Sequence, residues 1–93
     1  MCNEINEKSV QLTFNDLKMS IRQSFGSATI RRNKKSIKIL INTLWEPTDM
    51  EQHAVELLTG VGLEFSSVKA VLMHGGRAGG FVISNPELND GPN

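Results

Sequence analysis

The chain has 93 residues, of which 39% are hydrophobic and 22% charged, values typical of a single small globular domain. This composition argues against wholesale disorder, and the single cysteine, Cys2, rules out an internal disulfide. The polar start and the lack of a long apolar run predict a cytoplasmic protein with no membrane partner.

The net charge is zero, but the charges are unevenly distributed along the chain. Between Lys18 and Lys38 there are seven bases and no acid, whereas between Glu46 and Glu64 there are five acids and no base. We expect one domain over residues 1–85, with residues 1–8 frayed, followed by a flexible tail over 86–93. The charge asymmetry suits an anionic partner or head-to-tail contact between copies of the chain.

The first predicted element is an amphipathic helix of about three turns. Thr13 and Asp16 resemble a capping box at its start, and Gly26 can end it. A short strand over residues 10–13 before the helix is left open. The apolar positions recur at spacings of three and four, as in Phe14, Leu17, Ile21 and Phe25.

Residues 28–32 and 35–42 alternate between apolar and polar side chains and predict a β-hairpin. A two-residue turn at Asn33 and Lys34 would place Arg32 opposite Lys35 and Ile30 opposite Ile37. The isoleucines would then share one face. The other face would carry Arg31, Lys38 and Leu40, and the tip would be surrounded by Arg32, Lys34 and Lys35.

The rest of the chain repeats the same plan. Pro47 starts a second helix, with Thr48 or Asp49 as its cap, and Gly60 and Gly62 mark its end. Strands over residues 65–73 and 81–84 follow, with residues 75–78 as the loop between them. We therefore predict an α+β fold of order αββαββ, a two-layer sandwich in which two helices cover one face of a four-stranded, mainly antiparallel sheet.

The face of the sheet away from the helices is expected to be unusually apolar. Such a face suggests cover by a second subunit or another protein, although scattered surface valines explain it equally well. We expect a homo-oligomer, a dimer as the simplest case. The candidate interface residues are Leu40, Val71, Met73, Val82 and Trp45, the last as an anchor of either the core or the interface.

The basic hairpin is the main candidate site. Its cations can neutralise backbone phosphates of a nucleic acid, although charged hairpin tips also serve merely to keep edge strands soluble. Because few aromatic residues remain for base stacking, weakly sequence-specific contact with a duplex fits better than recognition of single strands. The candidate residues are Arg22, Arg31, Arg32, Lys34, Lys35 and Lys38.

A glycine-rich segment around Arg77 is the second candidate. Gly75, Gly76 and Gly79 allow close approach to an anion, and the guanidinium suits phosphate or carboxylate, but a plain hairpin loop explains the same residues. His53 and His74 have no second ligand at metal spacing, and no nucleophile, base and anion hole come together. We expect no cofactor, no metal and no enzymatic activity.

The sequence thus favours a small non-enzymatic binding module that contacts nucleic acid or an acidic protein surface through its basic hairpin. The alternative is a protein-interaction or inhibitor module, as in compact accessory proteins of phages and mobile elements. That module would act through the apolar sheet face and the acidic second helix.

Overall fold

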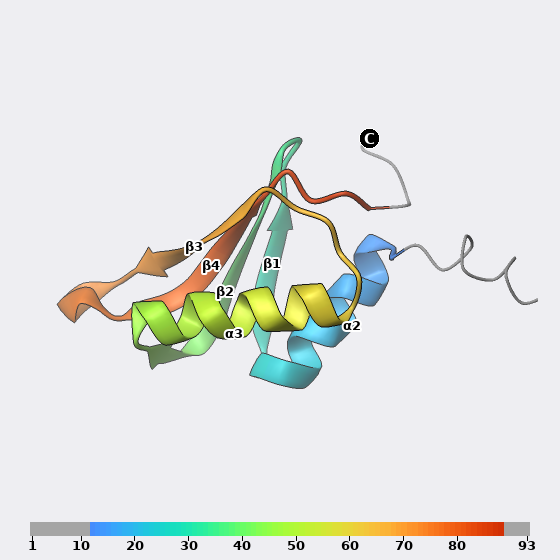
Figure 1. Cartoon of the computed structure of the whole chain (residues 1–93). Coiled ribbons are helices and arrows are strands. Elements are labelled where there is room, and N and C mark those ends of the chain that lie inside the picture. The colour runs from blue at the N-terminus through green and yellow to red at the C-terminus, as the bar shows by residue number, and fades with distance from the viewer. Residues whose placement is uncertain (1–11, 89–93) are drawn as a thin grey trace, which may run out of the picture.

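The computed structural model describes residues 12–88 (Figure 1). Two helices and four strands follow the predicted order, so the α+β prediction is confirmed. The elements are α2 (Phe14–Phe25), β1 (Ala28–Arg32), β2 (Ser36–Trp45), α3 (Pro47–Gly60), β3 (Ser67–Leu72), the short 3-10 turn η1 (His74–Gly76) and β4 (Ala78–Ser84).

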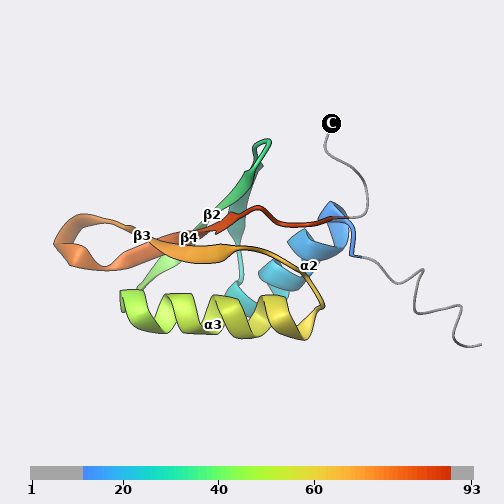
Figure 2. The same cartoon turned by 45° about the horizontal axis from the view of Figure 1, so that its top comes forward.

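The four strands form one antiparallel sheet in the order β1-β2-β4-β3, so the two hairpins lie side by side through β2 and β4. The order is symmetric: the first strand of each hairpin lies at an edge of the sheet, and the second strand of each lies at the centre. Both helices pack on the same side of the sheet (Figure 1 and Figure 2). We call the uncovered side the open face.

Helix α2 is stabilised at its start by the predicted capping box. The Thr13 hydroxyl accepts a hydrogen bond from the Asp16 amide at 3.1 Å, and the Asp16 carboxylate accepts one from the Thr13 amide at 3.5 Å. The helix ends at Phe25, where Gly26 takes a positive φ of 86° that side chains disfavour. Leu17 and Ile21 point into the core.

We predict that Thr13→Ala destabilises the protein by about 1 kcal/mol, because the Asp16 amide loses its partner at the helix start. The urea midpoint of unfolding, followed by circular dichroism, measures the change. Asn15→Ala, at an exposed position in the same turn, is the control and should leave the midpoint unchanged or slightly higher. An equal midpoint for Thr13→Ala and wild type would contradict the capping role.

Helix α3 begins differently from the prediction. Glu46 is its N-cap and makes no capping hydrogen bond with its side chain, while Pro47 occupies the first helical position. Thr48 and Asp49 therefore lie inside the first turn and are not caps. A proline at this position sacrifices no hydrogen bond of the helix, because the first helical amides have no partner within the helix.

One hydrophobic core joins the helices to the sheet. The side chains of Met50, Ala54 and Leu58 form the buried stripe of α3. They pack with the two buried residues of α2 against the helix-facing side of the central strands. The buried strand residues are Ile37, Ile39, Ala78, Phe81 and Ile83.

The register of the first hairpin is shifted by two residues from the prediction. Ile30 pairs with Ile39 and Arg32 with Ile37, because the turn is centred on Lys34 and Lys35, one residue later than predicted, and residues 33–35 separate the strands. The Asn33 amide donates to the Ser36 carbonyl at 2.7 Å and closes this loop. A shift of two keeps every side chain on its predicted face, since strand side chains alternate with a period of two.

The second hairpin shows the same shift and an irregularity. Ala70 pairs with Phe81, and the register then changes between Val71 and Leu72. Ala78, Gly79 and Gly80 are strand residues, so β4 starts three residues earlier than predicted and the loop spans residues 73–77. Figure 1 and Figure 2 show this hairpin extending past the first turn of α3.

Residues 86–88, predicted as part of a flexible tail, are attached to the domain. The Glu87 amide donates to the Glu64 carbonyl at 2.8 Å, and Leu88 packs against the core. Leu12 and Thr13 belong to no strand, and the remainder of the suggested strand over 10–13 lies outside the described residues. The predictions for residues 1–8, Cys2 and residues 89–93 also fall outside them.

Candidate nucleic-acid interface

Three cations form one row across the open face. Arg31 of β1 lies opposite Lys38 of β2, Lys38 lies opposite Val82 of β4, and Val82 lies opposite Lys69 of β3. All three cationic side chains are exposed. From the spacing of adjacent strands, this cationic row (Arg31, Lys38, Lys69) spans roughly 14 Å.

A row of hydroxyl groups lies next to the cationic row. Ser36, Ser84 and Ser67 are paired across β2, β4 and β3. Each lies two residues away from the member of its strand that belongs to the cationic row. Beyond this serine row comes the loop that carries the exposed Lys34 and Lys35. Cations with neighbouring hydroxyl donors form the set of groups that binds phosphate oxygens.

The hairpin loop is anchored to the sheet. The Asn85 amide, just after β4, donates a hydrogen bond of 2.7 Å to the Lys35 carbonyl. Together with the Asn33 to Ser36 bond, this contact fixes the backbone that carries the two loop lysines. Lys34 and Lys35 are exposed, and no contact between either side chain and a carboxylate is found among the described residues.

The described strands contribute cations but no carboxylates to the open face. The four strands of the described structure contain no Asp or Glu. Arg31 and Lys38 are direct cross-strand neighbours, an arrangement that destabilises a sheet because like charges repel. An anionic partner would remove this repulsion.

Two predicted site residues lie elsewhere. Arg32 shares the helix-facing side of β1 and stacks over the Phe14 ring, 5.0 Å from its centroid, so it does not belong to the tip. Arg22 donates to the Ala28 carbonyl at 3.3 Å along the β1 edge. Lys18 Nζ also lies over the Phe14 ring, 4.9 Å from its centroid.

The predicted apolar patch is present on the open face in reduced form. Leu40, Val71 and Val82 alternate outward as expected, and each is half-buried. Trp45 follows a register shift in β2 and packs against the core on the helix side. Trp45 is therefore not an anchor of this patch. Met73 lies in the loop, and its side chain covers Gly79.

The glycine-rich loop is only partly as predicted. Gly75 and Gly76 take positive φ values in the turn, where Gly76 donates to the Met73 carbonyl at 3.1 Å. The Arg77 carbonyl accepts from the Met73 amide at 2.7 Å, and Arg77 is exposed. Gly79, however, is buried within β4 and is not available to a ligand in the loop.

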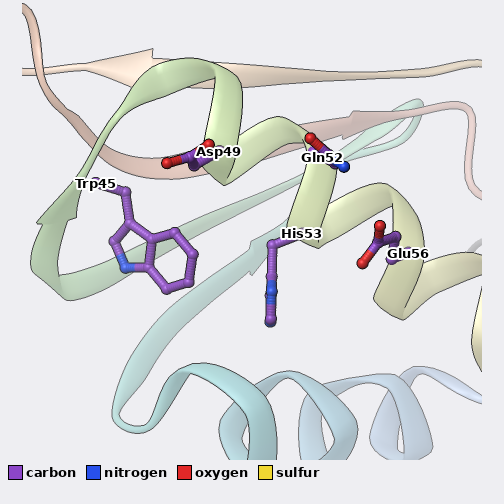
Figure 3. A pocket seen from close by; sticks show the side chains of 5 residues that line it. All are labelled: Trp45, Asp49, Gln52, His53 and Glu56. Carbon is purple, nitrogen blue, oxygen red and sulfur yellow. The ribbon is translucent and has the colours of Figure 1, made fainter.

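His53 takes part in an aromatic cluster between α2 and α3. Its ring lies 4.9 Å from Phe25 and 5.2 Å from Trp45, and Figure 3 shows the Trp45 and His53 rings extending toward α2. The Ser24 hydroxyl and His53 Nε2 are 2.9 Å apart. Within residues 12–88 no carboxylate hydrogen-bonds to this imidazole, so the serine–histidine pair lacks the third member of a triad.

Other classes of site are not found in the described part of the chain. Residues 12–88 hold no group of three or more His, Cys, Asp or Glu side chains suited to a metal ion. No helix among them is long and apolar enough to cross a membrane. Comparison with protein families, curated proteins and solved structures finds no match.

Sequence reasoning missed Lys69 and the serine row. Alternation along the third strand places Lys69 on the same face as Val71, so its orientation was available from the sequence. Its proximity to Lys38 depends on the order of the strands, which the sequence left open. The three serines meet for the same reason.

Proposed function

We propose that this protein is a non-enzymatic binding module whose open face contacts the phosphate backbone of a duplex nucleic acid. The observation that carries the proposal is the alignment of Arg31, Lys38 and Lys69 in one row, beside a row of serines and without a carboxylate in any described strand. Phosphate contacts of this kind give affinity with little base specificity.

The position of the aromatic residues favours a duplex over a single strand. Proteins that bind single strands stack bases on exposed aromatic rings. Here Phe14, Phe25, Trp45, Phe65 and Phe81 all belong to the core or pack against it. The open face therefore offers charge and hydroxyl groups but no stacking surface.

Salt dependence tests this function. With three to five phosphate contacts, the affinity for a short labelled DNA duplex should fall roughly 40- to 500-fold between 50 and 200 mM salt, because each contact releases condensed counterions. Fluorescence anisotropy measures the affinity. The absence of binding at 50 mM salt, or an affinity insensitive to salt, would exclude the function.

A protein partner is the second candidate, and the apolar patch favours it. Val82 lies within the cationic row, between Lys38 and Lys69, and Leu40 and Val71 lie immediately beside it. This arrangement suits an acidic surface with an apolar centre. In that case the double variant Val71→Ser, Val82→Ser should bind the partner protein more weakly than the wild type. The wild type itself should then not bind a DNA duplex.

A further inference from the structure

The two edges of the sheet are closed by side chains of opposite charge. At the β3 edge, Glu51 of α3 accepts a hydrogen bond of 2.8 Å from the Ala70 amide. At the β1 edge, Arg22 of α2 donates to the Ala28 carbonyl at 3.3 Å. Each contact occupies a backbone group that points away from the sheet, where another strand would otherwise bind.

From these edges we infer that copies of the chain associate head to tail, with β3 of one copy adding to β1 of the next. Within one molecule β1 and β3 run in opposite directions, because three antiparallel steps separate them. A second copy in the same orientation thus presents its β1 antiparallel to β3. The sheet would continue from copy to copy with all helices on one side.

Charge complementarity identifies a second copy as the occupant. Beside the β3 edge lies a shallow groove under α3 whose lining includes Glu51 and Glu56, with Val55 exposed on its rim. Beside the β1 edge lie the helix-side cations Lys18, Arg22 and Arg32. When β3 pairs with β1 of the next copy, Glu51 and the Arg22 of that copy lose their backbone partners at the new strand contact. The two side chains can then form an ion pair with each other.

Exposed apolar side chains support the same contact. In a register that places Ala70 opposite Ile30 of the next copy, Leu72 lies opposite its Ala28. Leu72 is 61% exposed in the isolated chain, the largest value among the exposed large hydrophobic residues of the described range 12–88. The added strand would cover it. The contact joins two different surfaces, the β3 edge of one copy and the β1 edge of the next. It therefore does not close into a dimer, and further copies can add at both ends.

Association of copies would extend the proposed surface for nucleic-acid binding, and its biological role rests on that proposed function. In the register above, Lys69 lies opposite Arg31 of the next copy, so the cationic row continues across the seam. This juxtaposition repels in the absence of a polyanion. A long duplex would relieve the repulsion and favour neighbouring copies.

Sedimentation velocity of the protein alone tests the inference apart from nucleic-acid binding. At low salt, the weight-average mass of the wild type should rise with concentration and pass that of a dimer. Glu51→Arg and Arg22→Glu should each abolish the rise. A chain with both changes should regain it, because the opposite charges are exchanged between the edges. Lys69→Gln should strengthen association and weaken duplex binding.

Glu46→Arg is the matched control for Glu51→Arg, since it makes the same charge change at an exposed residue whose side chain makes no capping bond. It should associate as the wild type does. The inference is overturned by a wild type that stays monomeric throughout, by a plateau at the dimer mass, or by unchanged association in Glu51→Arg. Failure of duplex binding with intact association would instead reject the proposed function alone.

Discussion

Gly80→Ala should destabilise the protein by about 3 kcal/mol or more, a large share of the stability of a domain of this size. A β-carbon at this position would lie 2.9 Å from Leu40 Cα and 3.0 Å from the Ile39 carbonyl carbon. Both are backbone atoms of the central strand β2 and cannot rotate away. The added methyl group would therefore separate β2 from β4, the pair that joins the two halves of the sheet.

Gly60→Ala is the matched control for Gly80→Ala. Gly60 lies in the last turn of α3, and a β-carbon there meets no atom within 4 Å. This change should raise stability by up to about 1 kcal/mol, since alanine favours helix over glycine. Urea unfolding monitored by Trp45 fluorescence measures both variants. Equal midpoints for Gly80→Ala and wild type would contradict the close contact of the strands.

Lys38→Gln combined with Lys69→Gln should lower the affinity for a short DNA duplex on the order of 100-fold at 50 mM salt, and should reduce the salt slope by about 1.8, because two phosphate contacts are lost. Both side chains are exposed, so the fold should remain intact. Anisotropy titrations at several salt concentrations measure the affinity and slope. Stability should rise slightly, since Arg31 would no longer face a like charge.

Lys18→Gln combined with Arg22→Gln removes the same charge from the helix side and is the control. Lys18 contacts Phe14, and Arg22 contacts the β1 edge. A duplex long enough for only one protein molecule removes any contribution from association. Equal losses in the two double variants would mean that net charge, and not the cationic row, determines binding.

The first helix was predictable in detail because its signals are local. Thr13 and Asp16 define its start and Gly26 its end, and both act within one turn of the chain. The division of strand residues between the two faces was also predictable. An error of two residues in register left Ile37 and Ile39 in the core, because the alternation of side chains has a period of two.

The predictions that failed depended on irregular strand pairing. Met73 was expected on the open face by simple alternation, but it follows a change of register near the end of β3. Trp45 was predicted as a core or interface anchor, and it packs against the core after a register shift in β2. Gly79 and Gly80 hinted at such irregularity, since glycine within a strand often marks a bulge or a close backbone approach. Arg32 was assigned to the tip because the turn was placed at Asn33 and Lys34, one residue before its position in the structure.

The candidate site depended on information that the sequence lacks. The cationic row exists because β2 and β4 are neighbours, which brings Lys69 within two strands of Lys38. Nothing in the local sequence around either lysine specifies that β2 and β4 are adjacent. The set inferred from the sequence therefore stayed within one hairpin, whereas the observed row includes the second.

The strand order β1-β2-β4-β3 has a consequence for the descent and design of this fold. Each half contributes a helix and a hairpin, and within the sheet the halves meet through β2 and β4, where Ile37 pairs with Ile83 and Ile39 with Phe81. Two identical half-chains related by a twofold axis would build the same sheet. The protein thus has the geometry of a small homodimer joined into one polypeptide, with different surface charges on its two halves.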